Sequence, residues 1–127
     1  MSLAVAYNID NDTNYMLSFE DDGYYWYMHP YFEKLLEDTG IYIDLYGYAQ
    51  FNRGNINQIE ITINQISSSL INEKQYFNVY CGTQIKPIKK DIYKKVSKVE
   101  LASKLDVINE IIETIKNNGG NLVFEGD

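Results

Sequence analysis

The chain has 127 residues, a formal net charge of −7, 45% hydrophobic residues and one cysteine. This length and composition are typical of one domain that buries its core without disulfides or metals, and a single cysteine excludes an internal disulfide. No apolar run approaches the roughly 20 residues of a membrane-spanning helix, and the first residues lack the pattern of a secretory signal, so we expect a single cytoplasmic domain over 1–127.

The charge is unevenly distributed along the chain. Residues 1–44 carry nine acids and one base, residues 84–98 carry six lysines and one aspartate, and residues 99–127 carry six acids and two lysines. An acidic protein attracts basic partners and repels nucleic acid, and the pI of about 4.6 is opposite to that of a typical nucleic-acid-binding domain. We therefore expect a basic protein as partner and no membrane partner, and the composition disfavours nucleic acid.

Two short strands are predicted at the N-terminus. Residues 3–9 and 15–20 are rich in strand-forming side chains, and the Asp- and Asn-rich segment 10–14 between them predicts a turn. The Asp-Asp-Gly sequence at 21–23 predicts a second turn because these residue types adopt turn conformations readily.

A short helix is predicted from His29 to Asp38. Pro30 fits the first turn of a helix, where the missing N–H has no intrahelical partner. Gly40 predicts the end of this helix. The apolar side chains that fall on one helical face are Phe32, Leu35 and Leu36.

Residues 41–48 alternate in polarity, which predicts a strand with two distinct faces. The first face carries Ile41, Ile43 and Leu45. The second face carries Tyr42, Asp44, Tyr46 and Tyr48. If the first face belongs to the core, these tyrosines lie outward as a binding stripe. The alternative is that they are buried with their hydroxyls at the rim.

Residues 55–71 fit two patterns. The segment QIEITINQI alternates as a strand does. The longer pattern is helical, because apolar residues recur at intervals of three and four over four turns after a start at Asn55 and Gln58 that resembles a capping box. These apolar residues are Ile56, Ile59, Ile63, Ile66 and Leu70. We therefore predict a helix, with a strand as the alternative.

Residues 75–82 and 85–96 predict two further strands, and the second is rich in lysine. The simplest explanations of this composition are an edge strand whose lysines discourage unwanted strand pairing, or an internal counter-charge to the acidic half of the chain. With Tyr93 interleaved, the same lysines could instead grip the phosphates of a single-stranded nucleic acid. A further possibility is that they face the acidic half of a second copy, which would give a homodimer.

The C-terminal part predicts a long helix and a final strand. Ser97 and Glu100 form a capping box, and Asn118, Gly119 and Gly120 supply the stop. The apolar residues between them recur at helical intervals: Leu101, Leu105, Ile108, Ile112 and Ile115. The whole chain predicts an α+β fold with a mostly antiparallel sheet, about three helices packed on one face and the order β-β-α-β-α-β-β-α-β.

The densest cluster of candidate functional residues lies between residues 20 and 48. Aromatic side chains there give large contact areas at a small cost in rotamer entropy, and neighbouring carboxylates favour a positively charged partner. The predicted partner-binding residues are Tyr24, Tyr25, Trp26, Tyr27, Tyr42, Asp44, Tyr46 and Tyr48, with Asp21, Asp22, Glu37 and Asp38 as a charged rim. This combination favours a non-enzymatic protein-binding module.

Catalytic and metal sites find less support. Asp10, Asp12 and Asn14 match the first ligand spacings of a calcium loop, but Tyr15 stands where that loop needs glycine, so a polar hairpin turn explains them better. Cys81 lies in an apolar alternation typical of an inert buried thiol. The only histidine therefore more simply starts a helix than pairs with this thiol, and we expect no metal and no cofactor.

The alternative function is a carbohydrate- or small-molecule-processing enzyme. Paired acids occur at 21–22, at 37–38 and at Glu110 and Glu113, and glycosidases use two carboxylates across a cleft with aromatic platforms. The competing interpretation of these acids is a solvated acidic face. No phosphate-binding, zinc-protease or serine-hydrolase motif occurs in the chain.

Several segments resemble a small bacterial family. They are GYYWYMHPYFEKL (23–35), TGIYIDLYG (39–47), VYCGTQIKP (79–87), DIYKKVSK (91–98) and the closing FEGD. Short acidic α+β proteins of this layout are similar to immunity proteins that neutralise polymorphic toxins of bacteria. The resemblance implies a cytosolic protein that binds and occludes a toxin, often a basic nuclease, and it assigns no role to an individual residue.

Overall fold

The computed structural model describes all of residues 1–127, and it contains six strands and three helices in the predicted order. In chain order the elements are β1 (Ser2–Ile9), β2 (Asp12–Glu20), α1 (Gly23–Thr39), β3 (Tyr48–Asn52), α2 (Ile56–Leu70), β4 (Tyr76–Gln84), β5 (Lys90–Ser97), α3 (Lys98–Asn118) and β6 (Asn121–Gly126). None of the three helices combines the length and the apolar character that crossing a bilayer requires.

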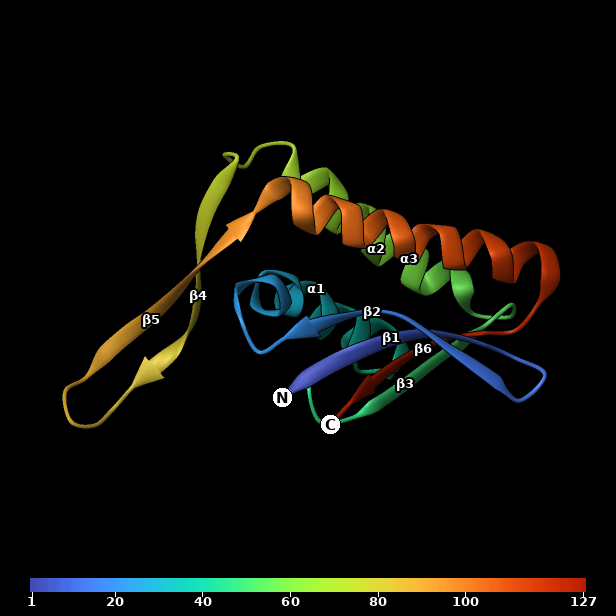
Figure 1. The fold of residues 1–127 in the computed structure, drawn as a ribbon, viewed down its shortest axis with the longest axis horizontal. Helices are drawn as coiled ribbons and strands as arrows, with labels where there is room; N and C mark the ends of the chain where they lie inside the picture. The colour runs from blue at the N-terminus through green and yellow to red at the C-terminus, as the bar shows by residue number, and fades with distance from the viewer.

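Four strands form one antiparallel sheet in the order β2-β1-β6-β3, and the helices gather on one side of it (Figure 1). The register places Val5 opposite Leu17 on one neighbour and opposite Phe124 on the other. Successive side chains of a strand point to opposite faces, so these residues share the face that packs against the helices. The N-terminal strand β1 pairs with the C-terminal strand β6, so the two ends of the chain lie in the middle of the sheet.

Helices α2 and α3 bury the stripes that the sequence predicts. Ile59, Ile63 and Ile66 of α2 are completely buried, and so are Leu105 and Ile108 of α3. Full burial of each such side chain stabilises the fold by about 1.5–3 kcal/mol. The strand alternative for 55–71 is wrong, because it would place Ile61 inside, whereas this side chain is 59% exposed.

Helix α1 starts six residues earlier than the sequence predicts. Oδ1 of Asp22 accepts the backbone N–H of Tyr24 at 2.9 Å, so Asp22 is the N-cap and Pro30 lies inside the helix. Gly23 allows this start, since a Cβ there would lie 2.6 Å from Cγ2 of the buried Val96. The consecutive aromatic residues therefore lie on a helix, where they point in different directions.

The predicted strand over 41–48 is wrong, although its alternation in burial is correct. Ile43 and Leu45 are buried and Tyr46 is exposed, but the segment is irregular and β3 begins only at Tyr48. Oδ1 of Asp44 accepts the backbone N–H of Tyr46 at 2.8 Å. This local bond turns the chain and replaces the ladder bonds that a strand would make.

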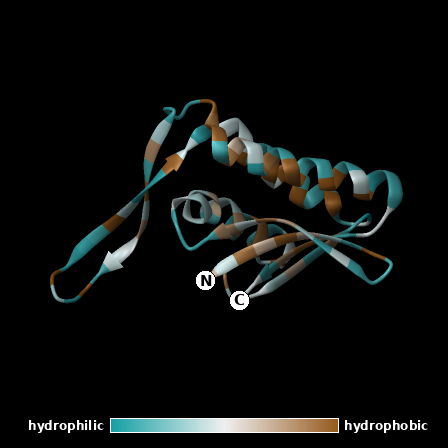
Figure 2. Cartoon of the chain, viewed as in Figure 1, coloured by the Kyte–Doolittle hydropathy of each residue, from teal (hydrophilic) through white to brown (hydrophobic).

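Strands β4 and β5 form a hairpin outside the main sheet, and this hairpin extends away from the body (Figure 1). Val96 is completely buried at the base, where Phe77 and Val79 also pack against the core. Hydrophobic and hydrophilic stretches are mixed along the rest of the hairpin (Figure 2). The predicted lysine-rich return strand thus exists, but it starts at Lys90 and pairs only with β4. We call residues 80–93 the arm.

Candidate functional site

Two adjoining hollows lie at the start of α1. The first, of about 210 Å³, is lined by Asp21, Tyr25, Trp26, His29, Tyr42, Asp44, Leu45 and Tyr46. The second, of about 570 Å³, is lined by Trp26, Tyr27, His29, Pro30, Glu73, Phe77, Asn78, Val79 and Tyr80. Because both include Trp26 and His29, they form one continuous surface from the 41–47 segment to the base of the arm. We call this surface the Trp26–His29 groove.

The rings at the centre of the groove are held in place by α1 and by hydrogen bonds. Trp26 and His29 are three residues apart, so they share a helical face, and their ring centroids are 4.9 Å apart. The indole N–H of Trp26 donates to Oδ1 of Asp21 at 2.8 Å. Tyr25 meets Trp26 edge-on, with centroids 5.2 Å apart. The groove therefore presents a fixed aromatic wall.

His29 links two other parts of the groove. Its Nε2 lies 3.0 Å from the hydroxyl of Tyr42, and its Nδ1 lies 3.4 Å from Oε1 of Glu33. Burial is the main reason that the pKa of Tyr42 lies above its usual value, so this phenol stays protonated near neutral pH. The histidine is thus engaged in orienting the 41–47 segment, and no nucleophile lies in this chain of hydrogen bonds.

The carboxylates of the groove are partly engaged in the fold. Asp21 accepts the Trp26 bond and Asp44 accepts the Tyr46 backbone bond, which leaves the second oxygen of each carboxylate without a protein donor. Glu73 lines the other end of the groove beside Phe77. The groove therefore has negative groups at both ends and aromatic or aliphatic side chains between them.

The structure brings together only part of the predicted partner-binding set. Trp26, Tyr27, Tyr42, Asp44 and Tyr46 line the groove, together with Asp21. Tyr27 is half-buried and its hydroxyl lies 2.6 Å from Oγ of Ser69, so only part of its ring faces the groove.

Tyr25 and Tyr24 have mainly structural contacts. Tyr25 is 1% exposed, its hydroxyl donates to the carbonyl of Ile43 at 3.1 Å, and burial raises its pKa strongly. It forms part of the groove floor and is not a surface anchor. The hydroxyl of Tyr24 donates to Oε2 of Glu100 at 2.7 Å and accepts the backbone N–H of Ser97 at 3.0 Å, so it joins α1 to the start of α3.

Besides Tyr24, four predicted residues lie away from the groove lining. Asp22 caps α1, and burial is the main cause of its raised pKa. Glu37 and Asp38 lie near the C-terminal end of α1, where Asp38 pairs with Lys34 at 2.9 Å. Tyr48 is in β3, beside Glu125 of β6, on the sheet face opposite the helices. The predicted stripe of four residues is therefore divided between two surfaces, because 41–47 is not a strand.

The sequence analysis missed the contribution of β4. Phe77 and Val79 face α1 and complete the second hollow with Glu73. The period-two spacing shows that these two side chains share a face. It does not show which helix that face meets, because the contact joins segments about 50 residues apart in the chain.

The other candidate chemistry does not assemble into a site. Asp10 and Asn11 both have positive φ angles, as in a tight hairpin turn, and no group of three His, Cys, Asp or Glu side chains could hold a metal. The thiol of Cys81 donates to the carbonyl of Val79 at 3.4 Å, and burial raises its pKa. It is therefore a protonated thiol whose bond is to the backbone.

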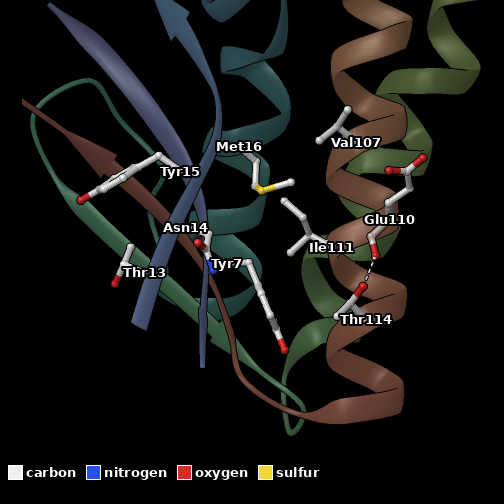
Figure 3. Close-up of a pocket in the computed structure, with 9 residues that line it drawn as sticks. All are labelled: Tyr7, Thr13, Asn14, Tyr15, Met16, Val107, Glu110, Ile111 and Thr114. Carbon is white, nitrogen blue, oxygen red and sulfur yellow. Dashed lines mark hydrogen bonds between the residues drawn. The ribbon is translucent and has the colours of Figure 1, made fainter. Parts of the chain in front are cut away.

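A further cavity of about 460 Å³ lies between β2 and α3 (Figure 3). Met16, Val107 and Ile111 line it together with Tyr7 and Glu110. One carboxylate among apolar and amide side chains is not a pair of groups for acid–base chemistry. We therefore regard the Trp26–His29 groove as the candidate site.

Comparison of the chain with protein-family models, with curated proteins and with solved structures finds no significant match in any of the three. The groove is therefore interpreted from its own geometry.

Proposed function

We propose that this protein is a non-enzymatic binding module whose Trp26–His29 groove binds a basic segment of another protein, as an immunity-like protein would bind a basic toxin. The supporting observation is the aromatic wall between negative groups at its two ends, Asp21 and Asp44 on one side and Glu73 on the other. A lysine or arginine side chain fits such a surface, because its aliphatic stem packs on rings while its charged end pairs with a carboxylate.

The energetics of such a contact favour a few anchors. A cation placed over the face of Trp26 gains about 0.5–2 kcal/mol, depending on how well water is excluded. Residues that dominate protein interfaces are enriched in tryptophan, tyrosine and arginine and sit in desolvated pockets. Trp26, Tyr42 and Tyr46 are positioned for this role, and the carboxylates steer the approach of a basic partner.

A second candidate function is a carbohydrate-processing enzyme, because Asp21 and Asp44 line the same hollow beside Trp26. Two carboxylates beside an aromatic platform are the minimum that glycoside hydrolysis needs. However, Oδ1 of each is engaged in a structural hydrogen bond, and the hollow of about 210 Å³ is small for a sugar chain. Turnover of a sugar panel that is lost in Asp44→Asn would support this alternative.

The binding function is tested by capture from a lysate of the source bacterium. The bait is the protein itself, and the matched variants are Tyr46→Ala in the groove and Tyr15→Ala on the opposite sheet face, since these tyrosines are 68% and 61% exposed. We expect wild type and Tyr15→Ala to retain the same basic protein, and Tyr46→Ala to retain about tenfold less. Recovery of acidic or neutral proteins alone, or equal recovery by all three baits, would contradict the proposal.

A further inference from the structure

The tip of the arm exposes apolar side chains that the rest of the chain does not cover. Ile85 and Ile88 are 71% and 72% exposed, and Tyr80 and Tyr93 are exposed further down the hairpin. A two-stranded hairpin is marginally stable alone, because it buries little apolar surface. A surface that covers these side chains would therefore stabilise the arm.

The arm also carries positive charge without ionic partners. Residues 80–93 carry Lys86, Lys89 and Lys90 against Asp91, a net charge of +2 within a total of −7, which leaves −9 for the rest of the chain. The ion pairs of the structure join Lys34, Lys116 and His29 to acids of the helices, and none involves an arm lysine. The same molecule thus presents a basic arm and an acidic body.

The tip of the arm cannot reach the groove of its own molecule. The groove lies at the foot of the arm, where Phe77 and Val79 form one of its walls. From Val79, strand β4 continues for five more residues to Gln84, or about 17 Å at the usual rise, and carries the tip away from that foot. An arm tip that occupies the groove must therefore come from another molecule.

We propose that two copies of this chain associate by placing the tip of each arm in the Trp26–His29 groove of the other. A twofold axis across the middle of the arm brings each tip to the foot of the other arm, which is the closed symmetry that a dimer requires. Ile85 and Ile88 meet the rings of the groove, while Lys86 and Lys89 meet Glu73, Asp21 and Asp44. This inference rests on the proposed function, since it names a second copy as an occupant of the same groove.

Other occupants fit the observations less well. Two arms packed only on each other would bring lysines together, which is unfavourable. A single-stranded nucleic acid could use the arm lysines and Tyr93, but it would approach a body with a charge of −9 and would leave Ile85 and Ile88 unexplained. A second copy offers both partners: its carboxylates would pair with the arm lysines, and the rings of its groove would cover the exposed isoleucines.

The test is sedimentation velocity of the full chain between about 1 µM and 1 mM at low and high salt. We expect a dimer that weakens as salt rises, because screening acts on exposed charges. The double variant Lys86→Glu/Lys89→Glu should raise the dissociation constant at least about tenfold, and adding Glu73→Lys to it should restore part of the affinity.

The apolar contact has its own matched control. Ile85→Ser/Ile88→Ser should weaken the dimer, whereas Ile61→Ser/Ile71→Ser, which changes two exposed isoleucines outside the arm, should not. A monomer at every concentration, or a dimer that no arm variant affects, overturns the inference. Arm variants that leave sedimentation unchanged but lose binding of a labelled oligothymidine would identify nucleic acid as the occupant and also overturn it.

The same variants separate this inference from the proposed function. Lys86→Glu/Lys89→Glu leaves its own groove free, so this monomeric bait should still capture a basic protein if the proposed function is correct. Dimerisation with no such capture would refute the binding function and leave the dimer. Capture of a basic protein by a wild-type protein that never dimerises would support the binding function and refute the dimer.

Discussion

The indole N–H of Trp26 and Oδ1 of Asp21 are 2.8 Å apart, so the largest ring of the groove is fixed by one of its carboxylates. Asp21 therefore has two roles, as an acceptor that orients Trp26 and as a negative charge. We expect Asp21→Asn, which can keep the acceptor, to weaken binding of a basic partner less than Asp21→Ala. Fluorescence anisotropy of Trp26, the only tryptophan, should stay nearly unchanged on substitution to Asn and fall on substitution to Ala. Equal effects of both variants would contradict the orienting role.

The N-cap of α1 gives a stability prediction. Asp22→Ala removes the acceptor of the Tyr24 N–H and should lower the free energy of unfolding by about 0.5–2 kcal/mol. Asp22→Ser, which keeps an acceptor, should lower it less. Urea unfolding measures both values, and a helix that began at His29 would be insensitive to either change.

The start of α1 also depends on a close approach to the arm base. Gly23→Ala would place a Cβ 2.6 Å from Cγ2 of Val96 and 3.1 Å from the carbonyl oxygen of Lys94. We expect it to lower the free energy of unfolding by about 1–3 kcal/mol. In a Val96→Ala background the added cost should be smaller, because the nearest atom is gone. An unchanged cost in that background would argue against this contact.

The buried phenol of Tyr25 should make the fold less stable at alkaline pH. Its pKa is raised in the folded state, mainly by burial, so its contribution to stability is complete below the unfolded pKa of about 10 and is lost as the pH rises above that value. Tyr25→Phe should lower stability at pH 7, because the Ile43 carbonyl loses its donor. That difference should shrink above about pH 10. A difference that is constant across this range would contradict the buried phenol.

Substitutions in α2 distinguish the helical from the strand interpretation of its sequence. Ile63 is completely buried and Ile61 is 59% exposed. Ile63→Ala should therefore lower the free energy of unfolding by about 2–5 kcal/mol. Ile61→Ala should change it by less than about 0.5 kcal/mol. The reverse order would indicate a strand in this segment.

The long amphipathic helices were predictable from the sequence because their periodicity is local and sustained. Ser97 caps α3 as expected, and its side chain accepts the backbone N–H of Glu100. The start of α1 was not predictable in the same way, because Pro30 is a strong signal for a first turn and the Asp22 cap competes with it. Such a conflict is decided by packing, here by Gly23 against Val96.

The candidate site was predictable in composition but not in shape. Asp21 and Trp26 do meet Tyr42, Asp44 and Tyr46 in one hollow, because α1 packs against the 41–47 segment. Tyr48, Glu37 and Asp38 lie outside the groove because a turn and the length of α1 separate them from it. The contribution of β4 required knowledge of a contact between distant segments.

The central claim is that the Trp26–His29 groove is occupied by a basic segment, and fluorescence of Trp26 reports on that groove directly. The decisive measurement is a titration of the Lys86→Glu/Lys89→Glu protein with the purified basic protein that the capture experiment retains. We expect a saturable change in Trp26 emission whose dissociation constant rises at least about tenfold in a Tyr46→Ala background and stays unchanged in a Tyr15→Ala background. Binding that leaves Trp26 emission unchanged, or that both backgrounds affect equally, would contradict the account.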